Sequence, residues 1–197
     1  PASVPDPEED ADGDFVIEYN VWDIQRVFQQ HNIRAGKEKV EIDFPTDYNT
    51  ELQCLKMSDD NEFVDAYMAI IPGITLAKIY KRYQQVLLEF TGKVNKGIRK
   101  TLREEPEMFF SYNNGISTTA SEIELKEIEG VMYITRLYDW QIVNGGQTTA
   151  SIAASLADRE VDLRKVFVPM KVSVIHDTEN ADALVKAIST SANSQTA

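Results

Sequence analysis

The sequence predicts a mixed α/β fold in which a mixed β-sheet is flanked by helices. In several short segments apolar and polar residues alternate at period two, and in others apolar residues recur at helical spacing. The two kinds of segment alternate along the chain, which is typical of mixed α/β and α+β layer folds. With 197 residues, 43% of them hydrophobic, the chain can bury a core of its own.

The expected elements follow one another in a definite order. A strand begins at residue 15, and Asn20 caps a helix that ends near residue 32. Strands are then expected at 40–44, near 52–55, at 64–71, 116–125, 131–137, 141–143 and 166–175. Helices are expected at 76–87, 94–102, 150–157 and 181–188, and the strand before Pro72-Gly73 should be buried.

The first fourteen residues differ from the rest of the chain. They contain six acidic residues, three prolines and no basic residue, so residues 1–14 are expected to be an acidic, disordered leader. Residues 15–197 are expected to form a single core. Because the chain starts at Pro1 without methionine and stops at Ala197 after a polar cluster, we expect a fragment that lacks a C-terminal part.

Composition restricts the classes of function. Cys54 is the single cysteine and there are two histidines, so neither a disulfide framework nor a Cys/His zinc site can be built. No apolar run is long enough to span a membrane and no secretory leader is present, so we expect a soluble, cytoplasmic protein without a membrane partner. The net charge of −12 means that any contact with nucleic acid must be local.

Three segments, which we call the polar clusters, are dense in uncharged amide and hydroxyl side chains: 111–115, 144–149 and 191–196. The middle cluster lies between a short strand and an Ala-rich helix, and this strand–helix motif is expected at the centre of the sheet. Its glycines would turn the backbone so that the first helical N–H groups face a phosphate or another anion. An equally weighted alternative is that the glycines only turn the chain and a threonine caps the helix.

The other two clusters have stronger structural alternatives. Asn113-Asn114-Gly115 has the composition of a tight hairpin turn, and the last cluster that of a helix cap and exit loop. We nevertheless expect the three clusters to converge on one ligand-binding pocket. Its predicted members are Asn113, Asn114, Asn144, Gly145, Gly146, Gln147, Thr148, Thr149, Asn193 and Gln195.

Binding is easier to derive than catalysis from these side chains. Amides do not titrate near neutral pH, so they cannot act as general acid or base. Only Asp139 and His176-Asp177 are candidates for proton transfer, and both are expected to be turn or surface residues. No catalytic residue and no metal ligand is therefore predicted.

A local excess of basic residues lies between residues 78 and 103. It holds eight lysines and arginines against one acid, Glu89. Lys93, Lys96, Lys100 and Arg103 form a stripe on one side of the second expected helix, and Arg99 is offset from it. The residues expected to guide a phosphate toward the pocket are Lys93, Lys96, Arg99 and Lys100. The alternative is a solvated helix face balanced by acidic neighbours.

Residues 94–102, 109–116, 141–149 and 193–195 together resemble the AIPR family, the abortive infection phage resistance proteins. The resemblance covers roughly Asp23 to the end of the chain. It implies a bacterial protein of antiviral defence, longer than this chain. Asn144 to Thr148 are also distantly similar to the Asp-Gly-Gln-Gln-Arg and Asp-Gly-Gln-His-Arg motifs of the ParB/sulfiredoxin-like group, which binds or hydrolyses nucleotides. The acid and the arginine are missing here, which favours binding over hydrolysis.

Three functions remain open at this stage. The first is binding of a nucleotide, with Mg²⁺ as its companion ion, or of a nucleic-acid phosphate. The second is a metal-assisted nuclease or NTPase, which requires carboxylates near Gly146. The third is a non-catalytic sensor of a phage protein, in which the amides of Asn113, Asn114 and Gln147 are used in turns and caps. The expected partners are a phage-encoded trigger and the missing C-terminal part.

Overall fold

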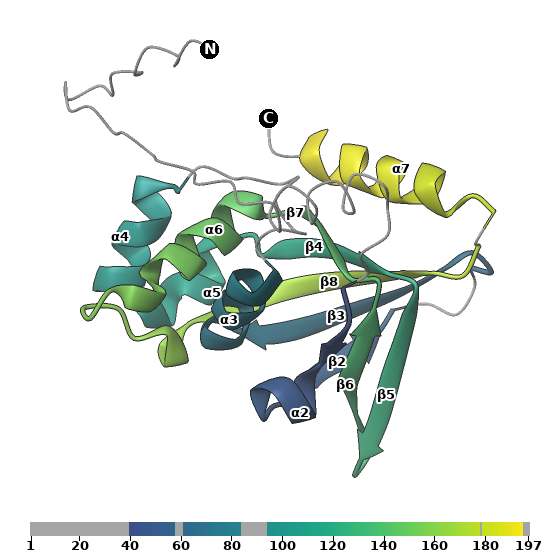
Figure 1. Ribbon diagram of the computed structural model, residues 1–197, viewed down its shortest axis with the longest axis horizontal. Helices are drawn as coiled ribbons and strands as arrows, with labels where there is room; N and C mark the ends of the chain where they lie inside the picture. Colours follow the sequence, from purple (N-terminus) through teal and green to yellow (C-terminus); the bar gives the residue numbers. More distant parts are fainter. Residues whose placement is uncertain (1–39, 58–60, 84–93, 178, 195–197) are drawn as a thin grey trace, which may run out of the picture.

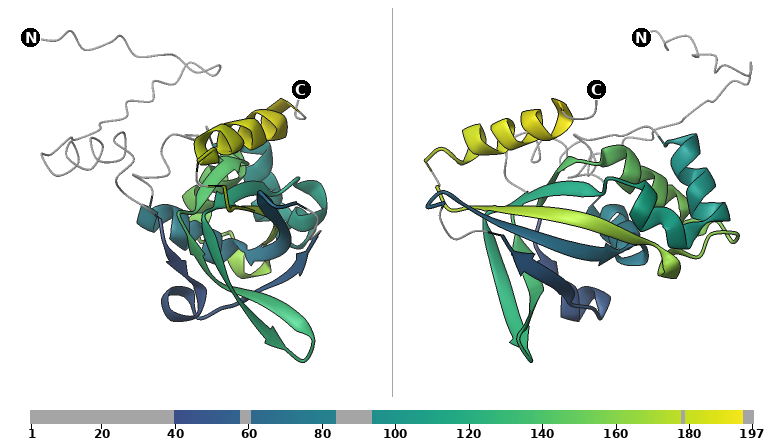
Figure 2. Two further views of the ribbon diagram at one scale, coloured as in Figure 1. Left: turned by 90° about the vertical axis from the view of Figure 1, so that its right-hand side faces the viewer. Right: turned by 180° about the vertical axis from the view of Figure 1, so that it is seen from behind.

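The computed structural model describes residues 40–57, 61–83, 94–177 and 179–194, which form a curled mixed β-sheet with helices on its faces (Figures 1 and 2). The predicted fold class is thus confirmed. The predicted leader, the strand from residue 15 and the helix at 20–32 lie outside the described residues, as do Lys93 and Gln195.

The sheet has eight strands: β1 (Ile42–Asp43), β2 (Leu52–Lys56), β3 (Val64–Pro72), β4 (Ile116–Ala120), β5 (Glu122–Ile128), β6 (Val131–Tyr138), β7 (Gln141–Asn144) and β8 (Phe167–Ile175). Their order is β1-β6-β2-β3-β8-β4-β7, and β5 also pairs with β6. The registers place β1 and β2 one after the other along one edge of β6, and β5 along the other edge. The β4–β8 pair is parallel and the other pairs are antiparallel.

Six α-helices and three 3₁₀ turns complete the described chain: α2 (Phe44–Tyr48), α3 (Gly73–Tyr83), α4 (Lys96–Glu104), η2 (Pro106–Met108), α5 (Phe109–Tyr112), α6 (Gly146–Ala154), η3 (Ser155–Ala157), η4 (Leu163–Lys165) and α7 (Ala181–Ser194). Helix α6 packs against both α3 and α4, whereas α7 lies apart from them along β7 (Figure 1).

The two faces of the sheet have different roles, and β8 shows the difference most clearly. Val168, Met170 and Val172 are fully buried beneath the helices α3 and α6, in one core with Ile71 and Ile152. The residues between them point to the opposite face, which we call the outer face. This alternation is the period of a strand with one buried face, and α7 covers part of the outer face.

Strand β7 carries the middle polar cluster to the edge of the sheet rather than to its centre. It pairs with β4 on one side, and α7 closes the other side. The backbone oxygen of Val143 accepts hydrogen bonds from Ser189 Oγ at 3.4 Å and Asn193 Nδ2 at 3.2 Å. A helix thus satisfies part of an edge that would otherwise be open to another strand.

Four predicted elements differ from the structure. The single strand expected at 116–125 is two strands, since β4 pairs with β7 and β8 whereas β5 pairs with β6. The strand expected at 40–44 is limited to β1, because Asp43 caps α2 through its carboxylate, which accepts from the Thr46 backbone N–H at 2.9 Å. Asn113-Asn114-Gly115 joins α5 to β4 and is not a hairpin turn. The polar residues 191–194 continue α7 instead of forming an exit loop, because their side chains and carbonyls bond within the helix and to β7.

In the part of the chain that the structure describes, none of the helices has the length and apolar character needed to cross a membrane.

Two leucines of β2 offer a test of which face forms the core. Leu52 is 1% exposed and Leu55 is 69% exposed, on opposite faces of the same strand. We expect Leu52→Ala to lower the free energy of unfolding by about 2–5 kcal/mol, because it leaves a cavity. Leu55→Ala should change it by less than about 0.5 kcal/mol. Urea denaturation followed by circular dichroism measures both, and equal losses would contradict this assignment of the faces.

Candidate ligand-binding groove

The three polar clusters meet at the carboxyl end of β7. Asn113 Oδ1 accepts a hydrogen bond from Thr148 Oγ1 at 3.2 Å, which joins the first cluster to the second. Asn144 Nδ2 donates to the Ala192 backbone oxygen at 2.7 Å and to Asn193 Oδ1 at 3.0 Å, which joins the second to the third. Segments up to about 80 residues apart in the sequence are thus held together by their own polar side chains.

Two glycines allow this close approach. Gly115 and Gly145 both have a positive φ, of 78° and 92°. A Cβ on Gly145 would lie 2.8 Å from the backbone oxygen of Gly115, and a Cβ on Gly115 would lie 2.1 Å from the backbone oxygen of Pro169. Only glycine fits both the backbone angle and the space, so these two residues of the motifs have a structural role.

Several predicted ligand-binding side chains also have structural partners. Asn113 Oδ1 accepts from the Gly115 N–H at 2.9 Å, and Gln147 Oε1 accepts from Asn95 Nδ2 at 3.3 Å. Thr149 is fully buried and its hydroxyl donates to the Gly145 oxygen at 3.1 Å. Thr148 is also buried. Gly145 is the N-cap of α6 and offers it no side-chain cap; binding of an anion by the first N–H groups of α6 stays a prediction.

A groove of about 590 Å³ lies next to the clusters, between α7 and the outer face of the sheet. This volume is within the range of small-molecule sites. The described lining residues come from β3, β4, β7, β8, α7 and the segment before β4: Met68, Asn114, Gly115, Ile116, Ser117, Asn144, Pro169, Lys171, Ala187, Ile188, Ser191 and Ala192. Each polar cluster contributes at least one of them, although Gln147, Thr148 and Thr149 do not line the groove.

Four lining residues form a row across four neighbouring strands, which we call the outer row. Met68 of β3 is paired with Lys171 of β8, Lys171 with Ser117 of β4, and Ser117 with Asn144 of β7. Residues in register on adjacent strands project from the same face at about 4.8 Å spacing. An apolar side chain, a cation, a hydroxyl and an amide therefore follow one another along the groove.

Lys171 is the charged member of the described lining, and it was not among the predicted site residues. Its side chain is exposed and makes no hydrogen bond or ion pair with the described residues. Thr118 Oγ1 donates to its backbone oxygen at 2.9 Å, which fixes this part of β8. In the sequence, Lys171 alternates with Met170 and Val172 as any solvent-facing strand residue would, so only the position of α7 identifies it.

The groove offers hydrogen-bond donors rather than negative charge. Among the residues that the structure describes, the side chains of Asn114, Ser117 and Ser191 make no hydrogen bond, and no carboxylate lines the groove. An amide and two hydroxyls can each donate, and the lysine ammonium adds three donors. Such a set favours an anionic ligand.

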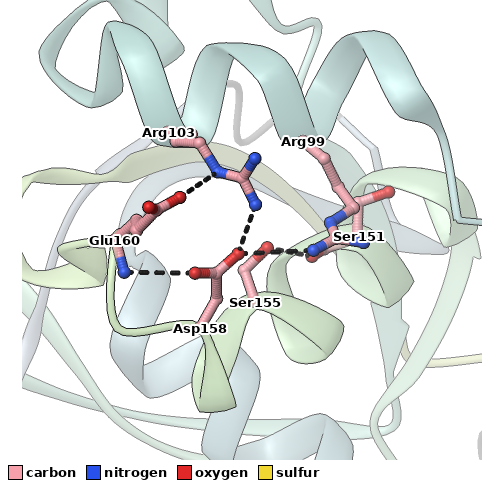
Figure 3. Close-up of polar contacts among 6 residues, drawn as sticks. All are labelled: Arg99, Arg103, Ser151, Ser155, Asp158 and Glu160. Carbon is pink, nitrogen blue, oxygen red and sulfur yellow. Dashed lines mark hydrogen bonds and ion pairs between the residues drawn. The ribbon is translucent and has the colours of Figure 1, made fainter.

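The predicted phosphate-guiding residues of α4 lie with α6 on the core side of the sheet, and two of them are paired with acids. Arg99 and Arg103 both bind Asp158, at 3.3 and 2.9 Å, and Arg103 also binds Glu160 at 3.1 Å (Figure 3). Lys100 Nζ lies 3.8 Å from Glu104 Oε2. Lys96 also has an interaction partner. These contacts attach α4 to the segment after α6, and a role in guiding anions stays a prediction.

Other candidate residues lie away from the groove. Asp139, in a turn with φ of 50°, accepts from Ser121 Oγ at 2.8 Å, and His176 Nε2 lies 3.0 Å from Asp65 Oδ2. Within the described ranges, no group of three His, Cys, Asp or Glu side chains lies close enough together to hold a metal ion.

In a comparison with protein families, the model described as AIPR protein matches residues 86–197, more than half of the chain. The matched span starts later than the predicted Asp23 and contains all three polar clusters. No curated protein and no solved structure matches the chain.

The close approach of the two motifs can be tested at glycine positions. We expect Gly115→Ala to lower the free energy of unfolding by about 2–5 kcal/mol, from the positive φ and the clash with Pro169 together. Gly130 has nearly the same φ, 79°, with nothing within 4 Å of an added Cβ, so Gly130→Ala should cost about 1–2 kcal/mol. Thermal and urea denaturation measure both variants. Equal losses would show that the contact with Pro169 is not tight.

The anchor of α4 predicts a pH dependence of stability. The hydrogen bond from Arg103, followed by that from the Glu160 N–H, holds the pKa of Asp158 below its usual value. A carboxylate whose pKa is lowered by folding contributes its full stabilisation at pH values above its pKa in the unfolded chain, about 3.9. That contribution to the free energy of unfolding is lost as the pH falls through the lower pKa of the folded state. The Asp158→Asn variant should therefore be less stable than the wild type at pH 7. The difference between their free energies of unfolding should become smaller below about pH 4.

Urea denaturation between pH 7 and pH 2.5 measures this gap. In an Arg103→Gln background, Asp158→Asn should lower the free energy of unfolding at pH 7 by less than it does in the wild type, because the Arg103 partner of Asp158 is already absent. A gap that stays constant with pH would contradict the assignment.

Proposed function

The chain belongs to the AIPR family, the abortive infection phage resistance proteins, and we propose that in this role it binds a nucleotide or a nucleic-acid phosphate in the groove beneath α7. The family supports the role in phage defence. The binding is our own inference. We also propose a cytoplasmic location, where a buried free thiol such as Cys54 remains reduced.

The observation that carries the proposal is the donor set of the groove. Lys171, Ser117 and Asn114 have no partner among the described residues, and the described lining contains no acid. An unpaired ammonium beside hydroxyl and amide donors is a good match for phosphate oxygens. The similarity of Asn144 to Thr148 to motifs of nucleotide-binding proteins supports a nucleotide in particular.

The same residues support binding over catalysis. Amide, hydroxyl and ammonium groups hold an anion without taking up its protons near neutral pH. Apolar residues such as Met68, Pro169 and Ile188 supply a second surface for the uncharged part of a ligand. We therefore propose binding as the primary function of this groove, with the remainder of a longer chain and a phage-encoded trigger as candidate partners.

One observation favours a second candidate, a non-catalytic sensor of a phage protein. Of the amides that this candidate invokes, those of Asn113 and Gln147 take part in hydrogen bonds within the chain, and so does that of Asn144. The Asn114 side chain makes none with the described residues. In that case the polar clusters serve the fold, and recognition takes place elsewhere on the surface.

A charge variant with a matched control tests the proposal. We expect the wild type to bind at least one member of a panel of nucleotides and short single- and double-stranded DNA and RNA in calorimetry. Lys171→Gln should weaken that binding at least about tenfold, because it removes a charge-assisted contact. It should also reduce the dependence of affinity on salt. Lys186 is an exposed lysine of α7 outside the groove lining, so the Lys186→Gln variant should bind with the same affinity as the wild type.

Two results would contradict the proposal. One is the absence of binding to every member of the panel by a folded wild type. The other is binding that Lys171→Gln and Lys186→Gln weaken equally, which would reflect general charge. If the panel does not bind and Asn144→Ala lowers the melting temperature, the sensor becomes the better candidate.

A further inference from the structure

We infer that the groove selects a ligand with one phosphate group on an apolar body, as in a nucleoside monophosphate, over a nucleoside triphosphate or a nucleic-acid strand. The inference rests on the proposed function, and it specifies which of the proposed ligands the site is built for. It follows from the charge of the groove, the order of side chains in the outer row and the apolar wall.

The charge of the groove lining limits how many phosphates it can neutralise. Lys171 is the single charged residue in the described lining. The arginines of α4, Arg99 and Arg103, are engaged with Asp158 on the other side of the sheet. One ammonium with neutral donors balances one phosphate, whereas each added phosphate brings charge into a chain that already carries −12.

The order of the outer row determines where that phosphate would lie. Ser117 and Lys171 are in register on β4 and β8, one strand spacing apart, so hydroxyl and ammonium can reach one phosphate together. Asn144 is in register with Ser117 on the far side. Its Nδ2 is used to hold α7, which leaves Oδ1 as an acceptor at the polar end of the groove.

The apolar end of the row lies on the other side of Lys171. Met68 is in register with Lys171 on β3, and Pro169 of β8 and Ile188 of α7 also line the groove. From Met68 to Asn144 the row spans three strand spacings, about 14 Å. A ligand whose phosphate lies between Lys171 and Ser117 would therefore place its uncharged part on the apolar wall, on the Met68 side of Lys171.

Calorimetry with AMP, ADP and ATP at one salt concentration, without Mg²⁺, tests the inference on the full chain. Other arms use the remaining three nucleoside monophosphates with their triphosphates, ribose 5-phosphate, inorganic phosphate and a short single-stranded DNA. We expect at least one nucleoside monophosphate to bind about tenfold more tightly than the matching triphosphate. Ribose 5-phosphate should bind more weakly than that monophosphate, because it does not use the apolar wall.

Three variants assign the preference to residues. Lys171→Gln should weaken binding of the monophosphate at least tenfold, and Ser117→Ala should weaken it less, since a neutral donor is lost. Met68→Ala should weaken binding of the nucleoside monophosphate but leave the affinity for ribose 5-phosphate unchanged. Lys186→Gln is the control, and melting temperatures verify that each variant is folded.

The outcomes separate this inference from the proposed function. If ATP or the DNA strand binds more tightly than every monophosphate, and binding still depends on Lys171, the inference is overturned and the proposed function stands. If neither these arms nor the wider panel of DNA and RNA shows binding by the folded wild type, both are overturned. Equal binding of the monophosphate and inorganic phosphate would also overturn the inference, because the apolar wall would then contribute nothing.

Discussion

The contact between the backbones of Gly115, Gly145 and Pro169 is the constraint on which the candidate site depends. Because none of the space between these segments could hold a Cβ, the start of β4 and the junction of β7 with α6 lie directly against each other. Asn113 then reaches Thr148, and Asn144 reaches α7. The groove is bounded by the same elements, so its shape follows from two glycines whose replacement would move its walls.

Polar residues in these clusters have two different tasks. Asn113, Gln147 and Thr149 bond within the chain and hold its segments together. Asn114 and Ser191 leave their donors free within the described residues, as does Ser117 of the neighbouring strand β4. This division explains why the motifs are rich in amides and hydroxyls but poor in charge: an amide can donate to one segment and accept from another without the desolvation cost of a buried ion.

Much of the fold could be predicted from the sequence, because alternation reports the buried face of a strand directly. The alternation of apolar with other residues predicts β8, whose buried members are Val168, Met170 and Val172. The Pro72-Gly73 pair predicts the end of β3. Asp43 as a helix cap depends on one side chain and was missed. The meeting of the three clusters was expected, yet Lys171 was not named, since its alternation with Val172 is also that of an ordinary surface residue. Its significance depends on α7, a contact that no local pattern contains.

The position of β8 also affects how the molecule is made. It lies between β3 and β4 in the sheet but comes last in chain order among the described strands. During synthesis β3 and β4 therefore leave the ribosome with open edges and remain unpaired on that side until residues 167–175 follow. The groove cannot exist before that moment, since Lys171 belongs to the strand that closes the sheet. Nascent chains that stop short of β8 should thus be prone to aggregate and have no binding function.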